Sequence, residues 1–245
     1  MAKKAKILML VEGAKTDIKL MQHLVKVYGI SESHQIVSYN TNIYELYNRM
    51  FKDGQQDSCD LLQILKEKEK DEDKKKIFDD RYSDILLIFD LDPQDPQFSP
   101  EHILEMLRYF SESTDQGKLY LNYPMVEAFY HMKAIPDEMY NSYAATMREL
   151  KNGSYKTRVR NENRNKDYRK FAIDFNECNI VIWRNIKKGL WMTGVAEDTQ
   201  NILPESESIL NVQLAKIKCD DSVSVLCTCV YYIVEYNPHL LIDGT

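Results

Sequence analysis

The sequence lacks the signatures of several common functional classes. It holds only eight glycines, and neither a G-x-x-x-x-G-K-[ST] loop nor a G-x-G-x-x-G loop occurs, which argues against P-loop and Rossmann dinucleotide enzymes. No apolar run reaches the roughly 18 residues that a membrane-spanning helix needs. The five histidines are dispersed and form neither an H-E-x-x-H pair nor a triad-like group. We therefore expect no membrane association and no chemistry based on glycine loops or clustered histidines.

The cysteines are few and scattered. The apolar run Ile7–Val11 near the N-terminus is too short for a signal peptide, so we interpret it as a buried strand. An odd number of cysteines without an export signal is typical of reduced thiols, and we expect a cytoplasmic protein. Cys227 and Cys229 lack the C-x-x-C spacing of zinc and redox sites. The five cysteines are Cys59, Cys178, Cys219, Cys227 and Cys229, and for Cys227 and Cys229 we expect buried small hydrophobic side chains rather than a metal site.

Positive charge is outnumbered overall but concentrated in one place. The chain has 32 Lys and Arg against 38 Asp and Glu, a net charge of −6, which argues against coating nucleic acid by bulk charge. The stretch 151–170, in contrast, holds eight basic residues, two acids and interleaved tyrosines, a composition that suits phosphate contacts and base stacking. The nucleic-acid contacts that we expect there are Lys156, Arg158, Arg160, Arg164 and Arg169. Two alternatives stay open: an exposed loop that balances acids elsewhere, or a surface for an acidic patch on a partner ATPase.

Hydrophobic periodicity predicts two parts of different architecture. Over residues 6–133, strand-like and helix-like segments alternate, and Asp84–Phe89 is a continuous apolar run typical of a strand buried on both faces. This order predicts an α/β domain, residues 1–133, with a mostly parallel sheet flanked by helices. Residues 134–245 are expected to form a mainly helical extension. Its predicted helices are Pro136–Leu150, Asp167–Lys188, Glu205–Lys218 and Ser222–Tyr236, with a strand as the alternative for the last.

Acidic residues follow two of the predicted strands. Glu12 follows the strand that ends at Val11, and Asp90 and Asp92 follow the buried run. Ligand sites in open parallel sheets lie at the carboxyl ends of the strands, so these three carboxylates can converge. Carboxylates brought together repel one another unless a cation neutralises them, and an all-oxygen cluster suits Mg²⁺ or Mn²⁺. The alternative is that each acid only caps a helix or solvates a strand end.

Three motifs in this order resemble the Toprim domain of topoisomerases, bacterial primases and OLD-type nucleases. They are the Glu-Gly at Glu12, the Asp-x-Asp at Asp90 and Asp92, and the segment Leu121–Phe129, which looks like the Asn-Pro-x-x-Glu element of small stand-alone Toprim proteins. The resemblance covers roughly residues 6–133. It implies that Glu12, Asp90 and Asp92 are catalytic and coordinate Mg²⁺ or Mn²⁺, and that Glu127 is either a further ligand or a helix N-terminal residue.

The resemblance also implies a function. Some small stand-alone Toprim proteins are encoded beside ABC-type ATPases in prokaryotic anti-phage defence loci, including the PARIS and RloB-like groups. We therefore expect a metal-dependent nuclease for DNA or RNA, including tRNA, that acts as a toxic effector and is restrained by a partner ATPase; a homo-oligomer is left open. The main alternative is a catalytically silent Toprim module that docks to an ATPase or to nucleic acid. A phosphotransfer or nucleotidyl enzyme on the same site is a third option.

Overall fold

The computed structural model describes residues 6–52, 54, 56, 60–114, 116–196 and 203–237. Packing groups the chain into two compact units, residues 1–89 with 101–119 and residues 90–100 with 120–245. The predicted α/β class is confirmed, with a mostly parallel sheet flanked by helices and a helical C-terminal part. The domain boundary after residue 133 stays a prediction.

Strands and helices alternate along the first unit. The strands hydrogen-bond in the order β2-β1-β3-β5-β4, and β8 (Leu226–Cys227) pairs with β5. The elements are β1 (Ile7–Val11), α1 (Thr16–Val27), β2 (His34–Ser38), α2 (Ile43–Met50), α3 (Leu61–Lys68), α4 (Glu72–Lys75), β3 (Asp84–Asp90), α5 (Pro100–Tyr109), β4 (Ser111–Glu112) and β5 (Gly117–Tyr123), whose last residues belong to the second unit.

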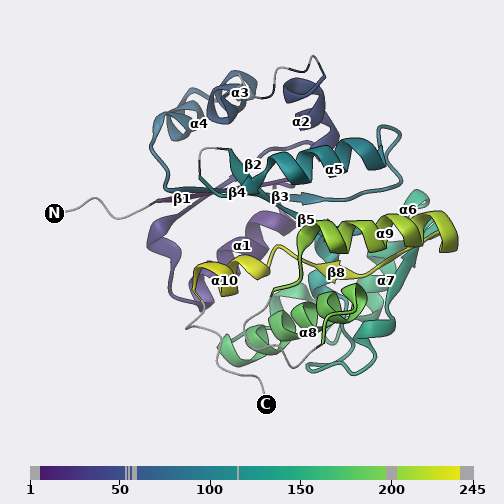
Figure 1. The fold of residues 1–245 in the computed structure, drawn as a ribbon. Coiled ribbons are helices and arrows are strands. Elements are labelled where there is room, and N and C mark those ends of the chain that lie inside the picture. Colours follow the sequence, from purple (N-terminus) through teal and green to yellow (C-terminus); the bar gives the residue numbers. More distant parts are fainter. Residues whose placement is uncertain are drawn as a thin grey trace. The chain divides into compact units, whose positions relative to one another are not determined.

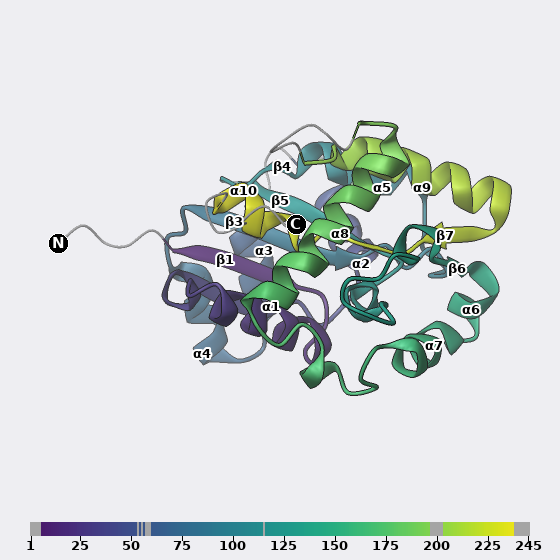
Figure 2. The same cartoon turned by 90° about the horizontal axis from the view of Figure 1, so that it is seen from below.

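The central strands of the first unit are buried on both faces. β1 pairs in parallel with β2 and with β3, so that Val11 lies opposite both Ser38 and Ile88. Every residue of β3 from Ile85 to Asp90 is buried, which explains why its sequence shows no alternation. Helix α1 covers one face of these strands, and α2, α3, α4 and α5 lie on the other (Figures 1 and 2). Each fully buried leucine, isoleucine or phenylalanine in this core contributes about 1.5–3 kcal/mol.

The second unit is mainly helical. A small antiparallel ribbon, β6 with β7, pairs Ala145 with Val223. The remaining elements include two longer helices, α8 and α9, and several short ones (Figure 2). The elements are β6 (Ala144–Thr146), α6 (Met147–Lys151), α7 (Ser154–Glu162), α8 (Phe175–Thr193), α9 (Ser206–Asp220), β7 (Ser222–Ser224), β8 (Leu226–Cys227) and α10 (Tyr231–Tyr236).

The helix predicted over Pro136–Leu150 is wrong. Its segment holds a 3₁₀ turn (Tyr140–Ser142), then β6, then the short helix α6. The buried carboxylate of Asp137 accepts hydrogen bonds from the backbone N–H groups of Lys133 (2.7 Å) and Met139 (3.0 Å). Such side-chain bonds to nearby backbone compete with a helix, and pairing with β7 then fixes the extended stretch.

Two other expectations about the second half need correction. Helix α8 begins only at Phe175, because the Asp174 carboxylate caps it by accepting from Glu177 N. Ser222–Tyr236 is not one helix: its first part forms the short strands β7 and β8, in line with the strand alternative, and helix α10 begins only at Tyr231.

The burial expected of the Cys227 and Cys229 thiols is confirmed. Cys178, Cys227 and Cys229 are buried, Cys219 is exposed, and all four are free thiols. Cys59 lies outside the described residues. The sulfur atoms of Cys227 and Cys229 lie 3.3 Å apart, within hydrogen-bonding distance, and both residues are free thiols.

Candidate metal centre

Backbone hydrogen bonds hold Glu12 at the carboxyl end of β1. Its N–H donates to the Ile88 carbonyl of β3 (3.0 Å), and its carbonyl accepts from Asn40 N (3.0 Å). Gly13 follows at a crowded position, where an added Cβ would stand 2.5 Å from the carboxylate of Asp17. The motif Glu-Gly is therefore explained locally: the acid ends a central strand and the glycine makes room for the first turn of α1.

Asp90 and Asp92 occupy the corresponding end of β3. Asp90 is the last residue of that strand and is 7% exposed. Asp92 has a left-handed backbone (φ +40°), a conformation that aspartate tolerates better than most residues, and its N–H donates to the Pro124 carbonyl (3.1 Å). The Asp92 carboxylate accepts from Gln94 Nε2 (2.9 Å).

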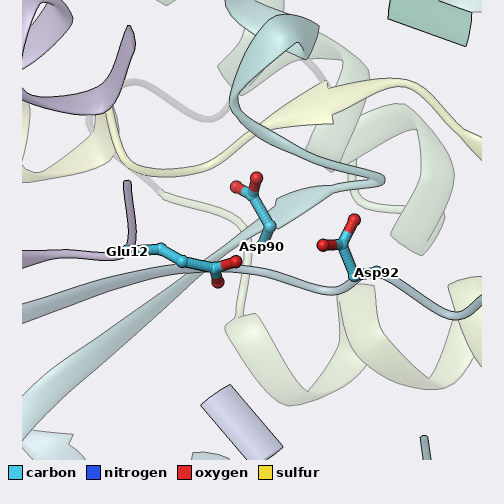
Figure 3. A group of neighbouring side chains, drawn as sticks. All are labelled: Glu12, Asp90 and Asp92. Carbon is cyan, nitrogen blue, oxygen red and sulfur yellow. The ribbon is translucent and has the colours of Figure 1, made fainter. Parts of the chain in front are cut away.

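The three predicted carboxylates come together. One oxygen from each of Glu12, Asp90 and Asp92 lies within 4.8 Å of the others, and Figure 3 shows the three side chains converging. Like charges at this separation disfavour one another's ionised form, and a divalent cation removes that repulsion. Hard oxygen donors and partial burial fit Mg²⁺ or Mn²⁺ by the chemistry of the donor set.

Asn122 is a residue of this site to which sequence analysis assigned no role. Its buried side chain donates from Nδ2 to Asp90 Oδ1 (3.3 Å). Its own Oδ1 accepts from Cys229 N (3.3 Å) and from Cys227 Sγ (3.5 Å). These bonds fix the amide orientation and thereby the position of the Asp90 carboxylate. The residue stood inside the motif-like segment 121–129, but nothing local in the sequence indicated its partners.

Glu127 lies outside the group of three carboxylates but is linked to it by charge. It is buried in the 3₁₀ helix Val126–Tyr130, and its Oε1 lies 3.4 Å from Lys156 Nζ of α7. Desolvation lowers the pKa of Lys156, but the charges of Glu127, Asp90 and Asp92 outweigh it and raise that pKa above its usual value. Lys156 is therefore a stable cation beside the carboxylates, and Glu127 positions it.

The other predicted nucleic-acid contacts are mostly engaged within the protein. Arg158 donates to the Ala144 carbonyl (2.6 Å) and pairs with Glu149, and Arg164 makes two hydrogen bonds to Glu177 (2.7 and 2.9 Å). Their guanidinium groups anchor α7 and the segment after it.

The other two predicted arginines have exposed side chains. The Arg169 guanidinium donates two hydrogen bonds to the Asp167 carboxylate (3.0 and 2.9 Å). Its side chain is 87% exposed, so solvent weakens this ion pair. Arg160 is exposed and makes no ion pair with the described residues. Lys156, Arg160 and Arg169 are therefore the predicted contacts that keep exposed charge, and the binding role of all five stays a prediction.

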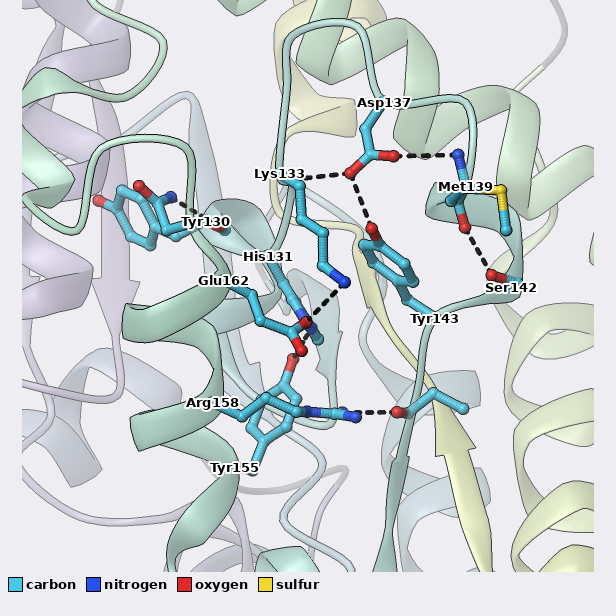
Figure 4. A network of polar contacts seen from close by, with 12 residues as sticks. Tyr130, His131, Lys133, Asp137, Met139, Ser142, Tyr143, Tyr155, Arg158 and Glu162 are labelled. Carbon is cyan, nitrogen blue, oxygen red and sulfur yellow. Dashed lines mark hydrogen bonds and ion pairs between the residues drawn. The ribbon is translucent and has the colours of Figure 1, made fainter.

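A second polar network in the second unit joins helix α7 to the segment that follows the 3₁₀ helix Val126–Tyr130 (Figure 4). His131, 1% exposed, lies with Nε2 at 3.1 Å from Glu162 and Nδ1 at 3.3 Å from Tyr155 Oη. Desolvation lowers the pKa of His131 to about 4 despite the hydrogen bond to Glu162, which raises it. The imidazole is thus neutral, with Nε2–H donating to Glu162 and Nδ1 accepting from the tyrosine.

Comparison with known proteins finds no matching family model, no similar curated protein and no similar solved structure. Within the described ranges, no helix has the length and apolarity needed to cross a membrane.

Proposed function

We propose that this chain is a Toprim-type, Mg²⁺- or Mn²⁺-dependent nuclease that hydrolyses phosphodiester bonds of DNA or RNA, tRNA included. One observation carries the proposal: Glu12, Asp90 and Asp92 each place a carboxylate oxygen within 4.8 Å of the others. The motif order in the sequence supports the same assignment. We also propose, from the family resemblance alone, a role as the toxic effector of an anti-phage system, restrained by a partner ATPase.

Each residue of the site has a defined task in this proposal. Glu12, Asp90 and Asp92 hold the cation, and Asn122 keeps Asp90 in place through its 3.3 Å hydrogen bond. A divalent ion bound there would supply Lewis acidity toward phosphate oxygens and would lower the pKa of water. Lys156, held by Glu127, offers positive charge to a phosphate oxygen of the strand. Glu12 also offers a general base, since its carboxylate is only partly buried.

The experiment compares cleavage of labelled single-stranded DNA, duplex DNA and tRNA by wild type, Glu12→Gln and Asp73→Asn. Asp73 is an exposed acid of α4 and serves as the matched control. We expect cleavage with Mg²⁺ or Mn²⁺ by wild type and the control, none with EDTA, and a loss of at least 100-fold in Glu12→Gln. Equal cleavage by Glu12→Gln and wild type would refute the assignment of Glu12 to a nuclease site.

The same experiment separates the main alternative. A silent binding module predicts no metal-dependent cleavage by wild type on any of these substrates, with nucleic-acid or ATPase binding that is unchanged in Glu12→Gln. The ATPase to be tested is the product of the neighbouring gene, where one is encoded. Toxicity on expression in cells, relieved by Glu12→Gln and by co-expression of that ATPase, would support the effector role.

A further inference from the structure

A pocket lies in the first unit that the proposed nuclease chemistry does not use. Its volume is about 340 Å³, within the range of small-molecule sites. It is formed where the end of β2 meets α3 and the segment after it. The lining residues are Leu10, Ser38, Tyr39, Asn40, Leu65, Lys68, Glu69, Lys70 and Phe78.

The pocket adjoins the backbone that positions Glu12. Tyr39 N donates to the Val11 carbonyl (2.7 Å), and Asn40 N donates to the Glu12 carbonyl (3.0 Å). The pocket and the Glu12 carboxylate therefore share the carboxyl edge of β1 and β2, where open parallel sheets place their ligands.

One side of the pocket carries two lysines, Lys68 and Lys70. Lys68 Nζ lies 3.3 Å from the centroid of the Tyr39 ring and donates to the Tyr39 carbonyl. Among the described residues, no carboxylate forms an ion pair with Lys68 or with the exposed Lys70. Glu69 lines the same pocket, but its Oε1 accepts from the backbone N–H groups of Lys70 (2.8 Å) and Asp71 (3.0 Å). Two lysines are thus available to an anion.

Burial makes an anion more favourable at this position. Desolvation and the charge of Arg49 lower the pKa of Lys68 to about 8, although the charges of Glu45 and Glu69 raise it. A bound anionic group would restore the favourable environment that the ammonium lacks.

The remainder of the pocket suits a planar, partly polar ring. Leu10, Leu65 and Phe78 are buried and form an apolar floor. Asn40, at the rim, has a left-handed backbone (φ +59°), and its Oδ1 accepts from Ser38 Oγ (2.7 Å). That bond orients the amide, whose Nδ2 reaches only a 3.4 Å contact with the Ser38 carbonyl. The amide can therefore donate to a ligand.

We propose that this pocket binds one nucleotide. The apolar floor takes the base, the Asn40 amide contacts the base edge, and Lys68 and Lys70 hold the phosphate. The nucleotide comes either free from solution or as one unit of a bound strand. Binding of a free nucleotide is independent of whether the neighbouring carboxylates cleave a phosphodiester, so this inference goes beyond the proposed function.

The test is calorimetric titration in EDTA with each of the four ribonucleoside 5′-monophosphates, with the matching nucleosides, and with a five-nucleotide RNA. The variants are Lys68→Met, Lys70→Met and the matched control Lys66→Met, a lysine of the same helix that pairs with Asp79 outside the pocket. We expect at least one monophosphate to bind, its nucleoside at least tenfold more weakly, and tenfold or greater weakening in Lys68→Met. Lys66→Met should bind as wild type does.

The outcomes separate the two sources of the nucleotide. Competition between monophosphate and RNA would place a strand unit in the pocket, whereas independent binding of both would indicate a free nucleotide. Failure of every monophosphate to bind, or equal weakening in the Lys66 and Lys68 variants, would overturn the proposal. Lys70→Met changes an exposed side chain and should fold, so monophosphate binding to this variant can still be measured if Lys68→Met unfolds. Loss of cleavage in Glu12→Gln with unchanged monophosphate binding would show that the two functions are separate.

Discussion

The buried His131 makes the second unit sensitive to acid. The folded protein keeps this imidazole neutral, since its pKa is lowered to about 4 from the usual value of 6.5. An unfolded chain takes up the proton near pH 6.5. Stability is therefore highest above that pH and falls as pH drops toward 4, because only the unfolded state gains the proton in that window.

The size of the effect follows from the two pKa values. The difference between 6.5 and about 4 corresponds to about 3 kcal/mol of unfolding free energy, most of it lost between pH 7 and pH 4.5. For comparison, a whole domain of ordinary stability unfolds with only about 5–15 kcal/mol.

The variant that tests this reasoning is His131→Gln, which cannot titrate but can still donate to Glu162. It should lose stability at pH 7.5, because the ring contacts disappear, and should show a flatter decline toward pH 4.5. The control is Tyr155→Phe, which removes the hydroxyl 3.3 Å from Nδ1 but keeps the imidazole and hence the steep decline.

The assay is urea unfolding at several pH values, followed by tryptophan fluorescence. Both tryptophans of the chain, Trp183 and Trp191, lie on α8 in the second unit, so the signal reports the unit that contains His131. We expect wild type to lose about 2–3 kcal/mol more than His131→Gln between pH 7.5 and pH 4.5. Parallel pH curves for the two proteins would refute the assignment of a neutral, proton-excluding histidine.

Three further predictions concern close packing around the site and core. Asn122→Leu removes the Oδ1 acceptor of the Cys229 N–H and a hydrogen bond to Asp90, so we expect a loss of about 1–3 kcal/mol in urea unfolding and reduced Mn²⁺ binding by calorimetry. Gly189→Ala would ordinarily favour a helix, but here its Cβ would stand 2.5 Å from the Pro204 ring, so we expect a lower melting temperature and about 1–3 kcal/mol of destabilisation. Gly13→Ala should lower the cleavage rate while largely preserving the melting temperature, because its Cβ displaces the Asp17 carboxylate in the first turn of α1, next to Glu12. A lower melting temperature with an unchanged cleavage rate would contradict this prediction.

The parts of the fold that could be predicted are those whose information is local. The uninterrupted run of β3 indicated a doubly buried strand, and the acids after it indicated the edge where Glu12 and Asp90 meet. The expected parallel sheet then predicted that these acids meet, because parallel pairing of β1 and β3 sets the carboxyl ends of the two strands side by side.

The parts that could not be predicted depend on partners distant in sequence. The Asn122 side chain bonds with Cys227, which is 105 positions further along the chain. Burial of Lys188 is possible because its ammonium donates to the carbonyls of Tyr140 (2.7 Å) and Tyr143 (2.9 Å). Composition indicated a basic stretch but could not show that Arg164 is bound to Glu177. The helix predicted across Asp137 was wrong for a similar reason, since tertiary pairing with β7 overrode helical periodicity.

The pairing of β5 with β8 has a consequence for the time at which the protein matures. Asn122 lies opposite Cys227, so this strand pair cannot close until 105 further residues have left the ribosome. At about 5–20 residues per second, that interval is roughly 5–20 s. Only then does the Asn122 amide gain the partners that fix it against Asp90. A nascent chain therefore carries an incomplete site until Cys227 and Cys229 have emerged, and under the proposed nuclease function this interval delays the onset of cleavage.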